Sequence, residues 1–442
     1  MMFKDLDGLV PTPVTLSKES QRELTDTADR VVAEALLSYE QYIGNNRQVD
    51  ARLWKHVKSR EKVHVYRTRR ATAKLLQLVN ERQLSRPRLL SNDTIELQQQ
   101  QAHAAGRPHG FTPDDEEAIL ERSAEKSGSG HSHSHSATHS SSSDTGSFCI
   151  FPEESVLEKV KPSRVPLVTA IGTIDGNVED VAFGALAHTD EAWFKRNSYV
   201  KNDGFDGRKV LASFQSPSEE DPFRYVGIKW ATRPIAAFAS RRDILFLESS
   251  GIALDSDGER VYYSLAHSIE VEDCPLLPDW CNVVRMNLSV CFIMRQTSET
   301  QIEVYARGFA DMGGNLPAAI GLGVFSQGIV DVVGIVEASY LKKLVWRMSR
   351  RCPTNVRQHM NAECSVCNKT TKRFGKLIQT GGTCAICRET ICQKCSVQKK
   401  LLLDVEGNIQ RQLTFCVSCV IETRKLSAWD VAIARLKAQQ RQ

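Results

Sequence analysis

The sequence lacks an uninterrupted apolar run of the length, about 20 residues, that a membrane-spanning helix needs. Its most apolar stretch, Leu316 to Leu344, is broken by charged residues such as Asp331 and Glu337. The first residues also lack the apolar segment of a secretory signal, because Asp5 and Asp7 interrupt it. We therefore expect neither a signal peptide nor a transmembrane helix, and a cytoplasmic location.

A charge excess of one sign is missing as well. The 57 Lys and Arg residues oppose 53 Asp and Glu residues over 442 positions, which leaves a net charge of +4. Because the chain has no global basic field, no nucleic-acid partner is expected. The chain also contains no G-x-S-x-G elbow, no P-loop and no G-x-G-x-x-G after a predicted strand. These absences predict a protein that is not an enzyme.

The first half of the chain contains patterns of both helix and strand. Apolar residues from Leu24 to Ile43 recur every three or four positions, and Ser20 with Glu23 fits a capping box, so an amphipathic helix is expected. Lys62 to Tyr66 alternates as a half-buried strand does. Between about residues 79 and 160 this order gives way to runs rich in Gln, Ser, Gly and His. We interpret that segment as a disordered insertion, with its histidines in a solvated linker.

The elements that follow the insertion indicate an α+β domain. Residues 167–174 are typical of a strand, and Asn177 is expected to cap the first of two short helices. Five further strand patterns lead to an amphipathic helix from about Pro317 to Arg350. In the fourth of these strands, Val283 to Met294, apolar residues share one side, which predicts a sheet with one apolar face.

This order of elements resembles that of the START-like lipid-binding domains found in oomycete proteins. Three segments carry the resemblance further: WKHVKSREKVHVYR (54–67), DPFRYVGIKW (221–230) and EASYLKKLVW (337–346). It covers residues 17–350 apart from the insertion, and implies a helix-grip fold: a curved antiparallel sheet, a tunnel for one lipid and a C-terminal helix as its lid.

The alternative to a lipid tunnel is a solid core, since each apolar stripe could simply be packed. The residues that would contact a lipid are unknown from the sequence. Three polar residues could anchor a headgroup, although a structural hydrogen bond is the interpretation we favour for each: His267, Arg285 and Arg307.

Eight of the 13 cysteines form four C-x-x-C pairs near the end of the chain: Cys364, Cys367, Cys384, Cys387, Cys392, Cys395, Cys416 and Cys419. A C-x-x-C turn lets two thiolates converge on one ion, and a tetrahedral Zn²⁺ needs two such turns. In a reducing cytosol, paired cysteines are more often metal ligands than disulfides. We expect two structural Zn²⁺ ions, each enclosed by four thiolates with no position for a catalytic water.

The spacing of these pairs, with ICQKCS (391–396) and CVSC (416–419), resembles a FYVE-type or FYVE-related zinc finger over residues 357–425. In that family the first and third pairs bind one ion, and the second and fourth pairs bind the other. The resemblance therefore implies two ligand sets: Cys364, Cys367, Cys392 and Cys395 for the first zinc, and Cys384, Cys387, Cys416 and Cys419 for the second. A RING finger shares this cross-brace but usually has a His among its middle ligands, which this sequence does not show.

FYVE domains bind phosphatidylinositol 3-phosphate with a basic run before the third cysteine. The corresponding residues here, 379–383 (QTGGT), contain no cation, so specific binding of that headgroup is not expected. The module still carries 12 basic and 5 acidic residues, which predicts weak, salt-sensitive attraction to anionic or phosphoinositide-containing membrane. A short helix at 427–440, with Trp429, Ile433 and Leu436 on one side, is expected to pack on the finger or bind a partner.

These patterns predict a non-enzymatic protein that binds or senses a lipid and is peripheral on endosomal membranes. Its FYVE-like module would dock to a membrane or to another protein. The alternative is a zinc-finger interaction adaptor, of the kind found in ubiquitin ligases, whose N-terminal domain binds no lipid.

Overall fold

The computed structural model describes residues 10–69, 155–200, 204–350, 363–370, 380–404 and 409–441. All of these residues belong to one compact unit. The insertion expected at about 79–160 lies outside the described residues, except for its last residues. These form a short helix, α5 (Val156–Val160), which Ser155 caps and to which the Glu34 carboxylate is hydrogen-bonded.

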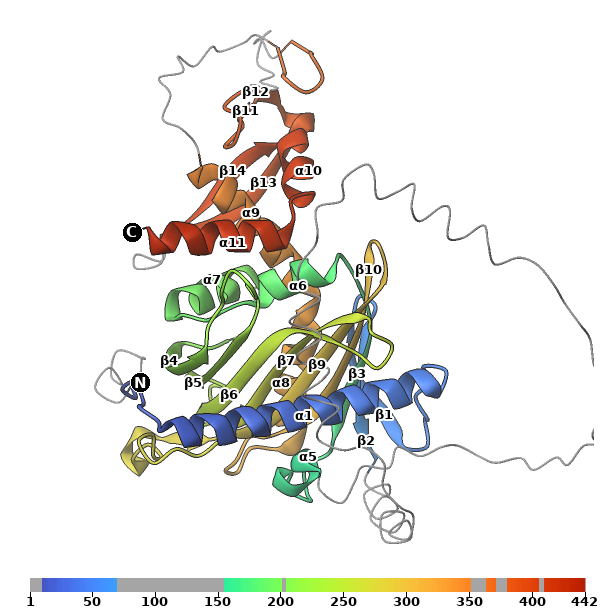
Figure 1. Cartoon of the computed structure of the whole chain (residues 1–442), viewed down its shortest axis with the longest axis vertical. Coiled ribbons are helices and arrows are strands. Elements are labelled where there is room, and N and C mark those ends of the chain that lie inside the picture. The colour runs from blue at the N-terminus through green and yellow to red at the C-terminus, as the bar shows by residue number, and fades with distance from the viewer. Residues whose placement is uncertain are drawn as a thin grey trace, which may run out of the picture. The chain divides into compact units, whose positions relative to one another are not determined.

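A large sheet organises the first part of the chain (Figure 1). Its main path runs β1-β2-β3-β10-β9-β7-β6-β5-β4, with all neighbours antiparallel, and β8 pairs in parallel with β6. The pairing of β3 with β10 joins the early strands to the late ones. In sequence order the strands are β1 (Trp54–Arg60), β2 (Val63–Thr68), β3 (Val168–Asp175), β4 (Gly207–Gln215), β5 (Tyr225–Arg233), β6 (Arg241–Leu254), β7 (Arg260–Ser268), β8 (Val283–Arg285), β9 (Asn287–Ser298) and β10 (Gln301–Asp311).

Helices cover both faces of this sheet. Helix α1 (Lys18–Gly44) lies across one face, where its apolar stripe packs on residues such as Leu265 and Ile293 (Figure 1). The other face, called the inner face below, packs against three helices: α6 (Val178–Ala185), α8 (Ala318–Val330) and α9 (Ile335–Ser349). The prediction of one apolar face is wrong, because in β9 Phe292 belongs to the inner core and Ile293 to the core under α1.

Helix α1 begins one turn earlier than the predicted capping box. The Ser17 side chain accepts a hydrogen bond from the Ser20 backbone N–H at 3.0 Å, so Ser17 is the N-cap and Ser20 lies inside the helix. The other end of α1 is held to the sheet by Glu303 of β10. Its carboxylate accepts hydrogen bonds from Tyr39 Oη and Arg47 Nε, each at 2.7 Å.

The long C-terminal helix was expected to be continuous, but it is interrupted. It divides into α8 and α9 around a 3₁₀ turn, η3 (Asp331–Gly334). Asp331 at this break accepts hydrogen bonds from Arg60 Nη1 of β1 and from Gln327 Nε2, both at 2.7 Å. The helix is therefore interrupted at a residue that contacts a strand distant in the sequence.

The whole stretch Ala318–Ser349 is long and apolar enough to cross a membrane by length and composition alone. Here its apolar residues Phe325, Ile329 and Val336 pack in the inner core. At Gly184 a Cβ would lie 2.1 Å from the Ile335 carbonyl oxygen, so only glycine lets α6 approach α9 this closely. Part of this stretch is thus buried in the core of the sheet domain.

The α+β fold class is confirmed, as is its arrangement as a large antiparallel sheet gripped by a C-terminal helix. The two short helices are also present as α6 and α7 (Asp190–Val200), and Asn177 caps α6 by accepting from the Asp180 N–H at 2.7 Å. Strand β4 was not predicted.

The cysteine-rich part of the chain consists of two small antiparallel hairpins and two helices. Its elements are β11 (Thr380–Thr383), β12 (Thr390–Cys392), a 3₁₀ turn η4 (Gln393–Cys395), β13 (Ser396–Asp404), β14 (Ile409–Cys416), α10 (Val417–Arg424) and α11 (Ala428–Gln440).

Candidate functional site

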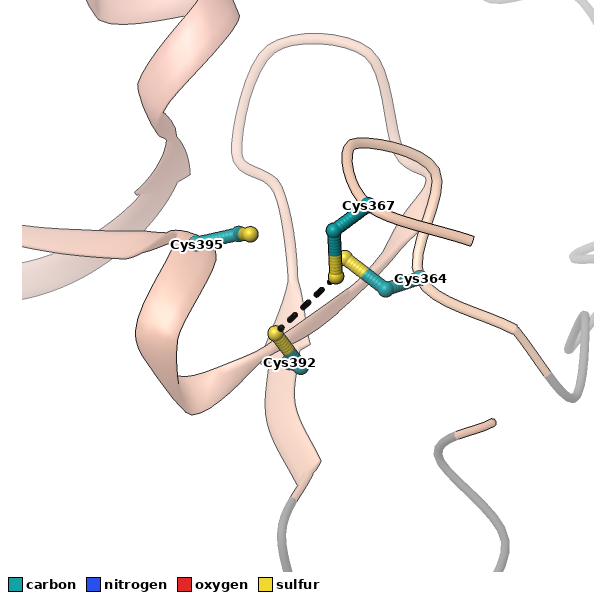
Figure 2. Close-up of side chains that lie close together, drawn as sticks. All are labelled: Cys364, Cys367, Cys392 and Cys395. Atoms are coloured by element: carbon teal, nitrogen blue, oxygen red, sulfur yellow. Dashed lines mark hydrogen bonds between the residues drawn. The ribbon is translucent and has the colours of Figure 1, made fainter. Parts of the chain in front are cut away.

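The first cysteine cluster joins a tight turn to the end of a hairpin strand. Cys364 and Cys367 flank a turn in which the Asn368 N–H donates to the Cys364 carbonyl at 2.8 Å, and Asn368 adopts a left-handed φ of 56°. Cys392 ends β12 and Cys395 ends η4. Figure 2 shows the four side chains directed toward one another, and their sulfurs all lie within 4.8 Å of each other.

The second cluster repeats this geometry with Cys384 and Cys387 in the turn. The Arg388 N–H donates to the Cys384 carbonyl at 3.0 Å, and Arg388 has a φ of 66°. Cys416 and Cys419 complete the cluster from the start of α10, where the Cys416 sulfur accepts the Cys419 N–H as the helix N-cap. These four sulfurs also lie within 4.8 Å of one another. The structure thus groups the same two sets of four cysteines as the cross-brace pattern.

The ionisation of the thiols differs within each cluster. Burial opposes ionisation of Cys364, but backbone N–H groups of Cys392, Val366 and Cys367 outweigh it and lower its pKa to about 6. In the same cluster, burial and the neighbouring sulfurs raise the pKa of Cys395 to about 12. Because one thiolate raises the pKa of the thiol beside it, a cation among the sulfurs is needed to ionise all four.

The donor sets fit a tetrahedral metal ion. A Zn–S distance of about 2.3 Å places two tetrahedral sulfurs about 3.8 Å apart. The Sγ atoms of Cys367 and Cys392 are 3.8 Å apart, and those of Cys387 and Cys416 are 3.9 Å apart. Each cluster could therefore hold one metal ion with four sulfur ligands and no open coordination position.

The hydrophobic core of the cysteine module extends onto the sheet domain. Its buried residues, among them Leu401 and Phe415 of the second hairpin, cluster with Leu341 and Leu344 of α9 and with Tyr199 of α7. Leu401 and Phe415 are each 0% exposed. Helix α9 thus contributes one side to the inner core of the sheet and another to the core of the cysteine module.

Polar contacts reinforce this junction. Arg347 of α9 donates to the Cys419 carbonyl and to Thr423 Oγ1, both at 3.1 Å, so a cluster cysteine is tied to α9 through its backbone. Lys343, which is fully buried, contacts Asp180 of α6 at 2.5 Å and donates to the Leu426 carbonyl at 2.7 Å. A single ammonium therefore bridges α6, α9 and the segment that follows α10.

Helix α11 packs on the sheet domain. Its Ala428, Val431 and Ala432 are buried in the inner core, and Trp429 contacts the Phe223 ring edge-on with centroids 5.4 Å apart. Ile433 and Leu436, expected on the same side as Trp429, are only partly buried. The helix is present, but it packs on the sheet domain and not on the finger as expected, and small residues form most of its buried face.

Of the run 379–383, which corresponds to the basic run of FYVE domains, the structure describes residues 380–383. Those residues form β11. Two cations of the module, Lys399 and Arg424, contact Glu337 of α9 at 2.5 and 3.7 Å. These two side chains hold the junction with the sheet domain, which reduces the positive charge that can face a membrane.

The three candidate lipid anchors have structural partners. His267 Nδ1 lies 2.8 Å from Ser289 Oγ, on the face covered by α1, and burial lowers its pKa to about 4. Arg285 donates to Asp243 at 2.8 Å and Arg307 to Ser38 at 2.9 Å. As we favoured from the sequence, each makes a structural hydrogen bond.

The inner face instead carries polar groups that the sequence analysis did not single out. Lys229 of β5 and Glu248 of β6 form a buried ion pair at 2.7 Å, close to Trp193 of α7. A lysine within the apolar run of β5 was the signal that could have identified them.

No family model matches the chain, and no curated protein matches it. Solved structures similar to it include human STARD10, with a TM-score of 0.34 and 10% identity over 70% of this chain and 82% of that one. Others are human StAR-related lipid transfer protein 5 (TM-score 0.33, 14% identity, 70% and 96% covered) and the human StarD13 (DLC2) lipid transfer and protein localization domain (0.32, 11%, 69% and 95%). A likeness at these scores identifies neither a ligand nor an activity.

Proposed function

We propose that the two cysteine clusters hold one Zn²⁺ each and form a FYVE-related zinc finger over residues 357–425. The sulfur-only donor sets, their tetrahedral spacing and the closed shells support a structural role for the metal. The first ion is assigned to Cys364, Cys367, Cys392 and Cys395, and the second to Cys384, Cys387, Cys416 and Cys419.

The metal content of the purified chain tests this assignment. Elemental analysis should give two zinc ions per chain for the unmodified protein and one for each of two variants, Cys367→Ser and Cys387→Ser. Cys352→Ser is the matched control, since this cysteine has no partner at C-x-x-C spacing, and it should keep both ions. Full zinc content in either cluster variant would contradict the ligand sets.

We further propose that residues 17–350 form a lipid-binding domain without enzymatic activity, which holds its ligand between the inner sheet face and the helices α6, α8 and α9. The observation that carries this proposal is the chemistry of that face. It is apolar across β2, β3, β9 and β10, yet at β5 and β6 it carries the buried pair Lys229 and Glu248. Beside this pair, the buried Nε1 of Trp193 on α7 lacks a hydrogen-bond partner among the described residues. An apolar surface with a few convergent polar groups is typical of a site for an amphipathic ligand.

The cysteine module would bring this domain to a cytosolic membrane, with anionic endosomal membranes as the proposed location. Among its described cations, Lys394, Lys400 and Arg411 make no ion pair with the described acidic residues. Lysine and arginine near an anionic surface contribute about 1 kcal/mol each, and that attraction is salt-sensitive. We propose that the module docks by charge and does not select one headgroup. The helix at 427–440 packs on the sheet domain and takes no part in this docking.

Lipid uptake by the full chain is the decisive measurement. The zinc-loaded protein is incubated with mixed vesicles, the vesicles are removed by sedimentation, and native mass spectrometry is recorded on the protein that remains. A bound lipid of defined mass, released on denaturation, is expected. A chain that stays free of lipid both as purified and after this incubation would refute lipid binding and favour the adaptor alternative.

A further inference from the structure

The fully buried Lys229 lies in a cage of two aromatic rings. Its Nζ is 4.9 Å from the centroid of the Trp193 ring and 4.7 Å from that of Tyr225. It donates to Glu248 Oε2 and to the Ala187 carbonyl, each at 2.7 Å. Aromatic cages of this kind bind quaternary ammonium groups such as choline. Here the chain's own ammonium takes that position, so a choline group would have to displace a paired lysine.

Buried donors without acceptors lie beside this lysine. Trp193 and Asn197 are one turn apart on α7 and so share a face, and they are 1% and 7% exposed. Trp193 Nε1 and Asn197 Nδ2 are completely buried and have no hydrogen-bond partner among the described residues. Both nitrogens can only donate. Because buried polar groups are rarely left unpaired, we expect a bound molecule to supply an acceptor for these two nitrogens.

The surrounding charges favour an anionic acceptor. Lys342 of α9, 7% exposed, donates to the carbonyls of Phe183 and Leu186 at 2.7 and 2.9 Å. Arg196 of α7 donates to Asn197 Oδ1 at 3.2 Å. These hydrogen-bond acceptors are neutral, whereas Lys229 has Glu248. Among the described residues, neither Lys342 nor Arg196 is hydrogen-bonded to a carboxylate. Burial, with the charges of Arg435 and Arg196, lowers the pKa of Lys342 well below its ordinary value. An anion at the turn between α6 and α7 would raise that pKa again and so favour the charged lysine.

A third cation comes from the C-terminal helix. The guanidinium of Arg435 in α11 lies 5.8 Å from the centroid of the Phe183 ring. Burial, together with the charges of Lys342, Lys229 and Arg435, lowers the pKa of His188 in this turn to about 4. His188 is therefore neutral at pH 7, and its Nδ1 is another buried atom without a partner among the described residues. Its low pKa agrees with a positive potential at this turn.

We propose that this group of residues, the α6–α7 cluster (His188, Trp193, Arg196, Asn197, Lys229 and Lys342), binds the phosphate of an anionic phospholipid. The inference rests on the proposed lipid-binding function and specifies the ligand class. Phosphate oxygens accept hydrogen bonds from Trp193 Nε1 and Asn197 Nδ2, and the uncompensated cations balance the charge. The same potential and the filled aromatic cage disfavour a choline headgroup. A free phosphate shares this chemistry, so the experiment has a separate arm for it.

The test uses the zinc-loaded full chain and vesicles that contain equal amounts of phosphatidic acid and phosphatidylcholine with matched acyl chains. After sedimentation of the vesicles, the lipid bound to the protein is identified by mass spectrometry. Phosphatidic acid should exceed phosphatidylcholine by about tenfold, as expected for charge-assisted hydrogen bonds. A parallel titration with inorganic phosphate detects binding of the free anion.

Two variants remove the unpartnered donors while largely keeping shape: Trp193→Phe and Asn197→Leu. Each should lower the enrichment of phosphatidic acid several-fold. Trp230→Phe is the matched control, because Trp230 of β5 is as buried as Trp193, but its Nε1 donates to Asp243 at 3.0 Å. It should leave the enrichment unchanged. Circular dichroism and zinc content confirm that all three variants are folded.

The outcomes separate this inference from the proposed function. Bound lipid without a preference for phosphatidic acid, or with a preference that both α7 variants retain, would overturn the inference and leave lipid binding intact. Binding of inorganic phosphate that depends on Trp193, in a chain that takes up no lipid, would overturn the lipid assignment. A chain that binds neither would overturn both.

Discussion

The sheet domain and the cysteine module bury their apolar residues in different ways. The sheet domain encloses two cores of its own, one under α1 and one under α6, α8 and α9. The cysteine module has two short hairpins and one helix of its own, and its core is completed by residues of α7 and α9. The comparison teaches that the module depends on two supports: the metal ions that we propose within it and the outer side of α9.

Metal removal is expected to have the largest effect on the difference in stability between the two regions. Without cations the clustered thiolates repel one another, so chelation of both ions is expected to unfold the module. Because the module covers part of α9, the melting temperature of the sheet domain should fall by about 5 °C while its fold persists. Hydrogen exchange at β13 and β14, followed with thermal melting, measures both effects. An unchanged melting temperature would show that α9 is stable without its cover.

The next largest effect is expected from Lys343→Met at the junction. The substitution leaves the buried Asp180 carboxylate without its ion pair, which costs about 3–5 kcal/mol of unfolding free energy. Urea denaturation measures the change. Lys437→Met is the control, because this lysine pairs with Glu219 at the surface and is 49% exposed, so it should cost less than about 1 kcal/mol. Equal costs would argue against a buried bridge.

A neighbouring pair of leucines in β13 tests how much the shared core contributes. Leu401 is fully buried against the α9 side, whereas Leu403 is 43% exposed. Leu401→Ala should cost about 2–5 kcal/mol and Leu403→Ala about 0.5 kcal/mol or less. The rate of zinc release to a chelator should rise in the first variant only. Similar behaviour of both variants would contradict the proposed packing.

The smallest effect concerns pH and the core under α1. Burial lowers the pKa of His267 from 6.5 to about 4, so between these values the unfolded chain binds a proton that the folded chain does not. Stability therefore falls as pH falls through this window, by up to about 1.4 kcal/mol per pH unit for this residue. His267→Asn should make the slope shallower in urea denaturation from pH 6.5 to 4. An unchanged slope would show that His267 titrates normally.

Local patterns made much of the fold predictable. The period of three to four residues identified α1, and Asn177 was identified as a helix cap because its effect acts within three residues. The grouping of the cysteines depended on repeated C-x-x-C spacing and on the family's pairing of these motifs. In each case the residues that form the feature are near one another in the sequence or belong to a repeated motif.

Features set by distant contacts could not be predicted. The break between α8 and α9 lies at Asp331, whose partner Arg60 is 271 residues away in the sequence. The two apolar faces of β9 were missed because polar residues near its start, such as Asn287 and Ser289, suggested a solvated side. Nothing in the spacing of the cysteines indicated that α9 would support them. Lys229 was detectable in principle, as a charge within an apolar strand.

The outer side of α9 also has a consequence for the order in which the chain is synthesised. Leu341 and Leu344 leave the ribosome well before the strands and helix that cover them, which lie between residues 396 and 424. During that interval the sheet domain presents an apolar stripe to the solvent, and exposed stripes of this kind favour aggregation. A messenger RNA that ends the chain soon after Ser349 would make this exposure permanent. Cells that lose the distal part of the message should therefore accumulate an insoluble protein.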